Sequence, residues 1–377
     1  MRSGARPTDV VAALDTGVVG DLAVASSPSF RVDGADAPAL NVAVIALEIS
    51  DDVAGMARLE ATFDNWGTPP GGGLPGYMFF DGGVVSFGRE LEVSLGPRGA
   101  RAVVFKGRIT SVGARFGATR SPELTVQAED DLQLFRFTRR TRTYEDVTDA
   151  EVAEALARAH RLDADCDAAG PRHRVLVQVA QTDLAFLRER AAAIDAQVWV
   201  AGGKLRFKSR NDRDGGELQL TLGSMLRRFD VVADLADQVA RVVGHGWDAG
   251  AKEDPSVEAA GSLVAGEARG ARDGASVMQR VFGAREDHVV DRPTASRDEA
   301  EALAKAVLLR RGRGFVRGSG ETEGTAALKV GSKMTILGVG PIFEGSYVAT
   351  QVTHRWDRVR AFHSGFTAER PAVGKES

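Results

Sequence analysis

The chain has 377 residues, a length typical of two or three domains, and its 43% apolar and 27% charged residues are ordinary for a globular protein. Its 43 glycines and 13 prolines stay below the share that marks low-complexity disorder. The 48 basic and 52 acidic residues leave a net charge of −4, which excludes a global basic field for nucleic acid or anionic membranes. The single cysteine, Cys166, excludes an intrachain disulfide and favours a reducing compartment.

The N-terminal residues 1–27 are expected to form an extension in front of the first domain. Charges interrupt this segment and leave no apolar core of the kind a signal peptide needs. The longest uncharged stretch, residues 65–80, is rich in glycine and proline, whereas a membrane helix needs about 20 mainly apolar residues. We therefore expect a soluble protein with no direct membrane span.

Residues 28–138 are predicted to form a first β domain. Several runs alternate apolar and polar residues at period two, and clusters of glycine and proline separate them. Strands in series without helices between them favour an antiparallel sheet or barrel. The expected strands are residues 41–49, 57–63, 89–95, 102–112 and 123–128.

Residues 139–211 have a different pattern, which predicts a compact α+β insert. Thr148 and Glu151 have the spacing of a capping box, and they start an amphipathic helix over residues 149–160. A second helix is expected over residues 183–196. The Gly202–Gly203 pair between two short apolar runs then predicts a tight hairpin, because such turns require positive φ angles.

Residues 212–371 are predicted to form a second β domain that contains one helix. Ser296 and Glu299 suggest another capping box, which starts a helix over residues 297–313. Residues 249–274, rich in glycine, alanine and charge, are expected to be a mobile loop. Other segments are assigned as follows: strands at 217–222, 238–247 and within 326–367, and a tail at 372–377.

No catalytic, cofactor or metal residue is assigned, and we expect no enzymatic activity. The six histidines lack the His-x-x-x-His zinc spacing, and His354 and His363 are expected to be sheet or surface residues. Gly338 and Gly340 form a lone Gly-x-Gly, which is better explained by turns than by a dinucleotide site. Carboxylates flank Cys166, and they oppose formation of a thiolate nucleophile.

Two charged clusters have competing interpretations. Glu129, Asp130 and Asp131 could hold a hard cation, although a solvated turn after a strand is favoured. Four arginines between residues 136 and 142 alternate with aromatic residues and could stack single-stranded nucleic acid. Because acidic residues lie beside them, a domain linker or protein interface is favoured, and no nucleic-acid specificity is expected.

The order of several motifs resembles the tail-hub family of contractile injection systems, which comprises phage late-control D proteins and the hub portion of VgrG spike proteins. Each motif is weak alone, but they follow the family's order from about residue 28 to residue 371. The similar segments are Phe105–Val112, Leu124–Leu134, Gln178–Arg188, Val243–Asp248, Asp298–Ala304, residues 331–345, Gly345–His354 and Phe366–Arg370.

This resemblance implies two β-barrel or sandwich domains related to the inner-tube protein, with a small helix–hairpin domain between them. It further implies a homotrimer that presents six tube-like units and joins a trimeric spike to a hexameric inner tube. The expected partners are a separate spike or needle protein, the inner tube protein and other baseplate proteins. The chain ends soon after Arg370, so it is expected to be a stand-alone hub without its own needle.

The loop over residues 65–80 carries the candidate interface residues Trp66, Tyr77, Phe79 and Phe80. Exposed aromatic side chains dominate binding energy at the centres of protein interfaces. The alternative is that these rings fold back onto their own sheet.

Two other classes of function stay open beside a structural hub. One is a tail-tip cell-wall hydrolase, which would need a pair of carboxylates or a nucleophile and base in a cleft. The other is a glycan- or peptide-binding β module. For the hub, we expect assembly in bacterial cytoplasm and incorporation into a phage tail or phage-like injection particle.

Overall fold

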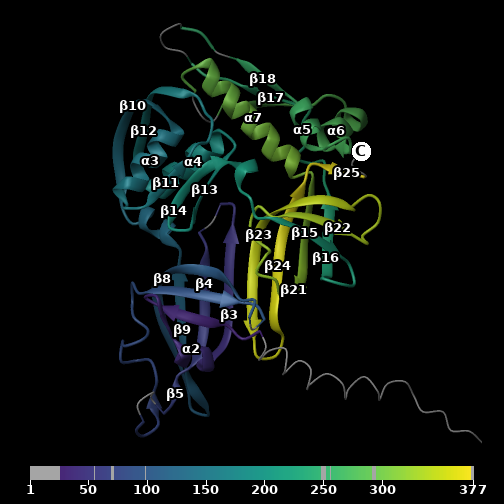
Figure 1. The fold of residues 1–377 in the computed structure, drawn as a ribbon. Helices are drawn as coiled ribbons and strands as arrows, with labels where there is room; N and C mark the ends of the chain where they lie inside the picture. Colours follow the sequence, from purple (N-terminus) through teal and green to yellow (C-terminus); the bar gives the residue numbers. More distant parts are fainter. Residues whose placement is uncertain are drawn as a thin grey trace, which may run out of the picture.

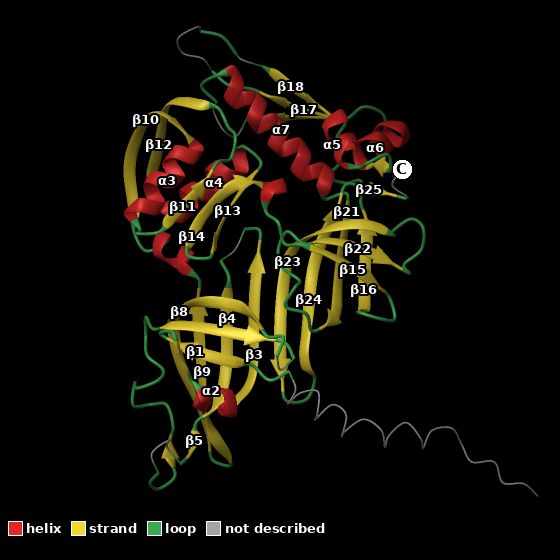
Figure 2. Cartoon of the chain, viewed as in Figure 1, coloured by secondary structure: helices red, strands yellow, loops and turns green. Residues whose placement is uncertain are grey.

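The computed structural model describes residues 26–54, 56–68, 72–97, 99–247, 252–254, 256–290 and 294–374. Strands predominate, with few helices, which confirms the mainly β fold class (Figure 2). Two β regions lie side by side, and layers that combine helices and strands cover one end of them (Figure 1). Among the residues with a described position, no helix is long and apolar enough to cross a membrane.

The first β half spans residues 29–129. In β4 the buried Leu59, Ala61 and Phe63 alternate with more exposed residues, as the period-two pattern predicts. One boundary was wrong: residues 41–43 belong to a helix, α2 (Pro38–Ala43), which Pro38 starts at a position where proline is well tolerated. The main strands are β1 (Ser29–Val32), β2 (Ala35–Asp36), β3 (Val44–Asp52), β4 (Arg58–Asp64), β7 (Glu90–Leu95), β8 (Ala102–Gly117) and β9 (Arg120–Glu129).

The second β half joins the first through its own strands. β23 pairs antiparallel with β3, from Gln351 opposite Asp52 to Asp357 opposite Ala46. One continuous sheet of thirteen strands therefore runs through both halves. Each half still has its own buried core. The strands of the second half are β15 (Glu217–Thr221), β16 (Leu226–Ala233), β21 (Val316–Glu323), β22 (Lys333–Leu337), β23 (Gly345–Asp357) and β24 (Ala361–Arg370).

The insert forms as its local signals predict. The Thr148 side chain accepts a hydrogen bond from Glu151 N, and the Glu151 side chain accepts one from Thr148 N, which confirms the capping box. Gly202 and Gly203 have φ angles of 60° and 75°, which confirms the tight hairpin. The elements are β10 (Arg139–Thr148), α3 (Asp149–Ala159), β11 (Asp163–Cys166), β12 (Arg172–Thr182), α4 (Asp183–Ala193), β13 (Ala196–Ala201) and β14 (Lys204–Ser209).

A further layer, here called the α7 layer, lies across the top of Figure 1. The prediction of a mobile loop over residues 249–274 was wrong for its described part, most of which forms two short strands and a helix. A Cβ atom added at Gly312 would lie 2.5 Å from Val264, so small residues here permit close packing. The elements are β17 (Arg241–Gly244), β18 (Val257–Ala260), α5 (Ser262–Glu267), β19 (Arg272–Asp273), α6 (Gly274–Phe282), β20 (Glu286–Val289) and α7 (Arg297–Arg313).

A buried ionic cluster of Asp149, His173, Arg190 and Glu299 connects the insert to α7. His173 Nδ1 lies 2.8 Å from Glu299 Oε1, and His173 Nε2 lies 3.1 Å from Asp149 Oδ2. Arg190 Nε donates to Asp149 Oδ1 at 2.6 Å. Burial alone would lower the pKa of His173, but the two carboxylates outweigh it and the pKa is raised. Glu299 therefore serves both this cluster and the start of α7, where it accepts a bond from Ala295 N.

A buried arginine at the end of β24 connects the C-terminal strands through hydrogen bonds. Arg370 is 2% exposed, and its guanidinium donates to the carbonyl oxygens of Glu344 and Gly374, both at 2.6 Å. Gly345 has a φ of 141°, and a Cβ atom there would lie 2.5 Å from that guanidinium, so glycine is required. Gly338 and Gly340 also have positive φ angles, as expected for turns.

Candidate interaction surface

The loop after β4 is folded into a small hairpin. Asn65 is fully buried, and its Oδ1 accepts hydrogen bonds from Met78 N at 3.0 Å and Phe79 N at 2.8 Å. Two short strands, β5 (Trp66–Gly67) and β6 (Gly76–Tyr77), then pair so that Trp66 lies opposite Tyr77. These contacts fix the directions of the aromatic side chains that follow.

Phe79 lies inside the first β half, although the sequence placed it with the interface candidates. Its side chain is 2% exposed, and its ring lies 6.3 Å from that of Phe63 in an edge-to-face contact. Phe63 in turn packs edge-on against Phe30 at 5.3 Å. Phe79 therefore anchors the loop in the core and presents no ring to a neighbour, as the folded-back alternative expected.

The other three candidates form an exposed group with a fourth ring, here called the aromatic cluster. Tyr77 lies 5.5 Å from Trp66, 5.1 Å from Phe80 and 6.2 Å from Phe116, measured between ring centroids. The exposed fractions are 48% for Trp66, 52% for Tyr77, 39% for Phe80 and 63% for Phe116. The structure thus brings three predicted residues together at the surface.

Sequence reasoning missed Phe116. This residue lies near the end of β8, which continues five residues beyond the predicted strand 102–112, to Gly117. The signal that could have located it is the Gly117–Arg120 turn of the β8–β9 hairpin, which brings Phe116 to the same end of the sheet. The hairpin loop and this turn are far apart in sequence, so no local pattern links their rings.

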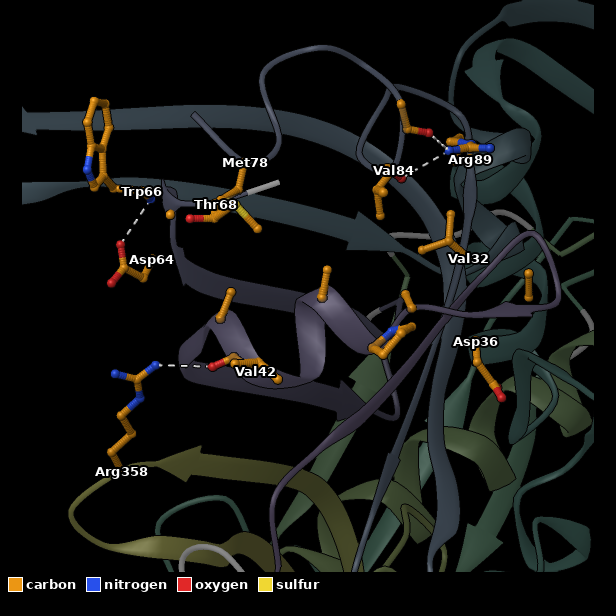
Figure 3. Close-up of a pocket in the computed structure, with 17 residues that line it drawn as sticks. Val32, Asp36, Val42, Asp64, Trp66, Thr68, Met78, Val84, Arg89 and Arg358 are labelled. Atoms are coloured by element: carbon orange, nitrogen blue, oxygen red, sulfur yellow. Dashed lines mark hydrogen bonds between the residues drawn. The ribbon is translucent and has the colours of Figure 1, made fainter. Parts of the chain in front are cut away.

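An apolar groove with a volume of about 820 Å³ lies beside the aromatic cluster. Figure 3 shows α2 with Val42 along one side and Trp66, Thr68 and Met78 along the other. Trp66 belongs to both features, so cluster and groove form one continuous surface. Val42 is exposed and extends the apolar surface that the aromatic cluster begins, and a contiguous apolar patch of this kind marks an interaction site.

Charged residues at the rim of the groove are held in place. Arg89 Nε donates to Asp33 Oδ2 at 2.8 Å, and Arg358 Nε donates to the Val44 carbonyl at 3.0 Å. A backbone hydrogen bond from Glu90 N and the neighbouring Arg89 together lower the pKa of Asp33. An apolar centre with a polar rim is the usual anatomy of a protein interface.

The acidic segment Glu129–Asp131 is a structural turn, and the expectation of a solvated turn was wrong. Asp130 accepts hydrogen bonds from Ala57 N and Leu132 N at 2.9 Å each, while Glu129 forms an ion pair with Arg136. Burial, which outweighs those bonds, raises the pKa of Asp130 to about 7. The carboxylates are therefore used within the fold.

His354, His363 and Cys166 lie buried within the fold. Within the described ranges, no group of three or more His, Cys, Asp or Glu residues has metal-binding geometry. His354 and His363 are sheet residues, both buried, and burial lowers the pKa of His354 to about 4. Burial, followed by the charge of Glu154, raises the pKa of Cys166 to about 12, which opposes a thiolate.

The arginine cluster lies where the chain enters the insert. Arg136 pairs with Glu129, Arg140 lies 3.5 Å from Asp183 Oδ2, and Arg142 lies over the Tyr144 ring at 4.9 Å. Each of these three guanidinium groups thus has a partner within the chain.

Residues 80–357 match the family model described as the Alg8 N-terminal domain. The chain belongs to this family. No curated protein matches it. Comparison with solved structures shows which known folds the fold of this chain resembles.

Three solved structures share the fold across most of the chain. The 43 kDa tail protein of prophage MuSo2 from Shewanella oneidensis has 10% identity and a TM-score of 0.67, covering 92% of this chain and 98% of its own. A tail protein from Neisseria meningitidis has 12% identity and a TM-score of 0.64, covering 92% and 96%. The E. coli c3393 protein, a type VI secretion component described as similar to T4 tail proteins gp27 and gp5, has 13% identity and a TM-score of 0.55, covering 89% and 76%. The fold is therefore that of phage tail proteins.

Proposed function

We propose that this chain is a structural hub in the baseplate of a contractile injection system or phage tail. In this role three copies assemble and join a trimeric spike to a hexameric inner tube. The observation that carries the proposal is the pair of β halves, each with its own core, within one sheet of the tail-protein fold. Three chains supply six such halves, which is the number that a threefold-to-sixfold adaptor needs.

The ends of the sheet support assembly with neighbouring chains. β16 is a terminal strand of the thirteen-stranded sheet, with β21 as its one partner among the described strands. An edge strand presents unpaired backbone groups, and pairing with a neighbour removes the aggregation hazard. Closed ring symmetry would cover such edges in every copy.

The aromatic cluster and apolar groove are the proposed contact surface of this hub. Strand β5, which carries Trp66, lies at the far end of the first β half, away from the insert and the α7 layer (Figure 1). The partners in this proposal are a second copy of the chain, an inner tube protein, a separate spike protein and other baseplate proteins. Assembly would take place in bacterial cytoplasm, before the particle is complete, and the role requires no enzymatic activity.

Mass photometry of the full chain tests the proposal, alone and with a tube-protein partner. Three chains of 40.0 kDa correspond to about 120 kDa. A Trp66→Ala, Tyr77→Ala, Phe116→Ala variant should lose trimer or tube docking while its far-UV circular dichroism stays unchanged. Phe137→Ala with Phe282→Ala removes exposed rings elsewhere and serves as the matched control.

Other outcomes identify a different function. A monomer under all conditions that cleaves cell-wall glycan would replace the hub by a tail-tip hydrolase. A monomer that binds a peptide or glycan through the groove would indicate a binding module. Assembly that the triple variant leaves intact would remove the aromatic cluster from the interface while keeping the hub.

A further inference from the structure

A second cavity, of about 350 Å³, lies where the insert, the α7 layer and the second β half meet. Its walls come from the segment after β14, from the ends of α5 and α7, and from β22, β23 and β24. The charged side chains that line it are six cations, Arg210, Arg213, Arg269, Arg313, Lys333 and Arg370, and two carboxylates, Glu267 and Glu369. This lining is distinct from the aromatic cluster and the apolar groove.

The buried guanidinium groups in the walls are fixed before any ligand arrives. Arg313 Nη1 pairs with Asp195 Oδ1 at 2.6 Å, and its Nη2 pairs with Glu267 Oε1 at 2.6 Å. Burial alone would lower the pKa of Arg313, but these two carboxylates outweigh it and the pKa is raised. The wall is therefore ordered in advance, so little conformational entropy is lost there when an anion binds.

Arg213 is held in the same manner on another wall. Its Nη2 lies 3.0 Å from Asp51 Oδ2, and its guanidinium lies 5.0 Å from the centre of the Trp199 ring. The ion pair reaches from the insert boundary to β3, so the wall joins distant parts of the chain. Burial lowers the pKa of Arg213, because the interior disfavours its charge.

Positive charge exceeds negative charge even when the outer partners are counted. Asp51 and Asp195 add two carboxylates to the two in the lining, which gives four against six cations. The whole chain has a net charge of −4, so this positive site is local. Guanidinium forks match the two oxygens of a carboxylate or phosphate, and ammonium groups add point charge.

We propose that this basic pocket binds an oxyanion, either inorganic phosphate or the carboxylates of an acidic peptide. The exposed cations Arg269 and Lys333 bind it at the rim, while the wall arginines, which are paired within the chain, add positive potential behind it. The bound anion would contact three layers of the molecule at once and stabilise their arrangement, because a ligand that binds only the folded state favours it. The inference goes beyond the hub role and does not depend on it.

Isothermal titration calorimetry on the full chain tests the proposal with two probes, sodium phosphate and an end-blocked hexaglutamate peptide. Chloride keeps the ionic strength constant in every titration. The Arg269→Gln, Lys333→Gln variant removes the two rim cations without disturbing the buried ion pairs. The Arg120→Gln, Lys204→Gln variant changes the net charge equally at exposed sites outside the pocket. Unfolding midpoints in chloride show that both variants fold.

The expected result is binding of at least one probe, weakened about tenfold in the pocket variant and about unchanged in the control variant. Binding of phosphate alone assigns a small oxyanion, and competition between the probes assigns an acidic peptide to the same pocket. Absence of binding by both probes up to about 10 mM would overturn the proposal. Equal weakening in both variants would also overturn it, since the attraction would then be diffuse.

Discussion

The two β halves share one sheet but use their surfaces differently. The first half closes around aromatic rings, with Phe30, Phe63 and Phe79 in contact, and leaves an apolar groove open at its far end. The second half closes around Arg370, and the α7 layer and the insert cover the end where that residue lies. The first half therefore exposes an apolar surface, whereas the second half uses much of its polar surface within the chain.

This difference shows how two β halves that share one sheet can expose different kinds of surface. An apolar surface gains binding free energy from any partner that excludes water. A network of buried charges instead fixes one arrangement, because removing one partner leaves a desolvated charge. We therefore expect substitutions to destabilise the two halves for different reasons: loss of apolar packing in the first half and loss of hydrogen-bond or charge partners in the second.

Phe79→Ala should have the largest effect and break the core of the first half. Truncation of a buried phenylalanine costs about 3–5 kcal/mol of unfolding free energy, because contacts are lost and a cavity remains. Urea denaturation measures this loss of unfolding free energy. Phe80→Ala, at the adjacent but partly exposed position, is the matched control and should cost clearly less. Equal costs would mean that Phe79 is not the anchor of the loop.

Arg370→Ala should be the corresponding break in the second half. It leaves the carbonyl oxygens of Glu344 and Gly374 without their donor, at a cost of about 3 kcal/mol. The same urea assay measures the loss, and Arg360→Ala, which removes an exposed pair with Glu321, provides the control. A loss of unfolding free energy as small as that of the control would show that the hydrogen bonds of Arg370 contribute little to stability.

His173→Gln should have a smaller effect that depends on pH. The folded-state pKa of His173 is raised, so its stabilising contribution is complete below the unfolded-state value of about 6.5 and is lost as pH rises through the folded value. The loss of unfolding free energy, about 1–2 kcal/mol, should thus be larger near pH 6 than near pH 9.

Denaturation at those two pH values measures this difference, and His288→Gln, at an exposed position, is the control. Burial alone would raise the pKa values of Asp149 and Glu299, but their bonds to His173 together with their other hydrogen bonds outweigh it, and both pKa values are lowered. Their contributions are present above their unfolded-state values of about 4 and are lost as pH falls through the lowered ones. A loss of unfolding free energy for His173→Gln that increases with pH would contradict this role of the ionic cluster.

Local sequence signals predicted the elements that depend on nearby residues. Thr148 with Glu151 and Gly202 with Gly203 define a cap and a turn within a few positions, and both are found. Ser296 also caps α7, but Glu299 accepts a bond from Ala295 N and not from Ser296 N, so the second predicted capping box forms only in part. The period-two runs likewise identified most strands. Their partners could not be predicted, because pairing depends on register and tertiary packing rather than on any single strand.

The missed features depend on contacts between distant segments. The packing of Val264 against Gly312 turned an apparent loop into an ordered helix pair. Phe116 joins Tyr77 across two hairpins, and the basic pocket collects arginines from three layers. In the candidate interface, alternation alone could not tell that Phe79 points inward while Phe80 points outward.

The pairing of β3 with β23 also has a consequence for synthesis. Asp52 lies opposite Gln351, so about 300 residues must emerge before β3 gains this neighbour. At roughly 5–20 residues per second, the edge of β3 stays open for about 15–60 s on the ribosome. Glu48, Asp51 and Asp52 place negative charge along that strand, and such charge discourages premature pairing between nascent chains.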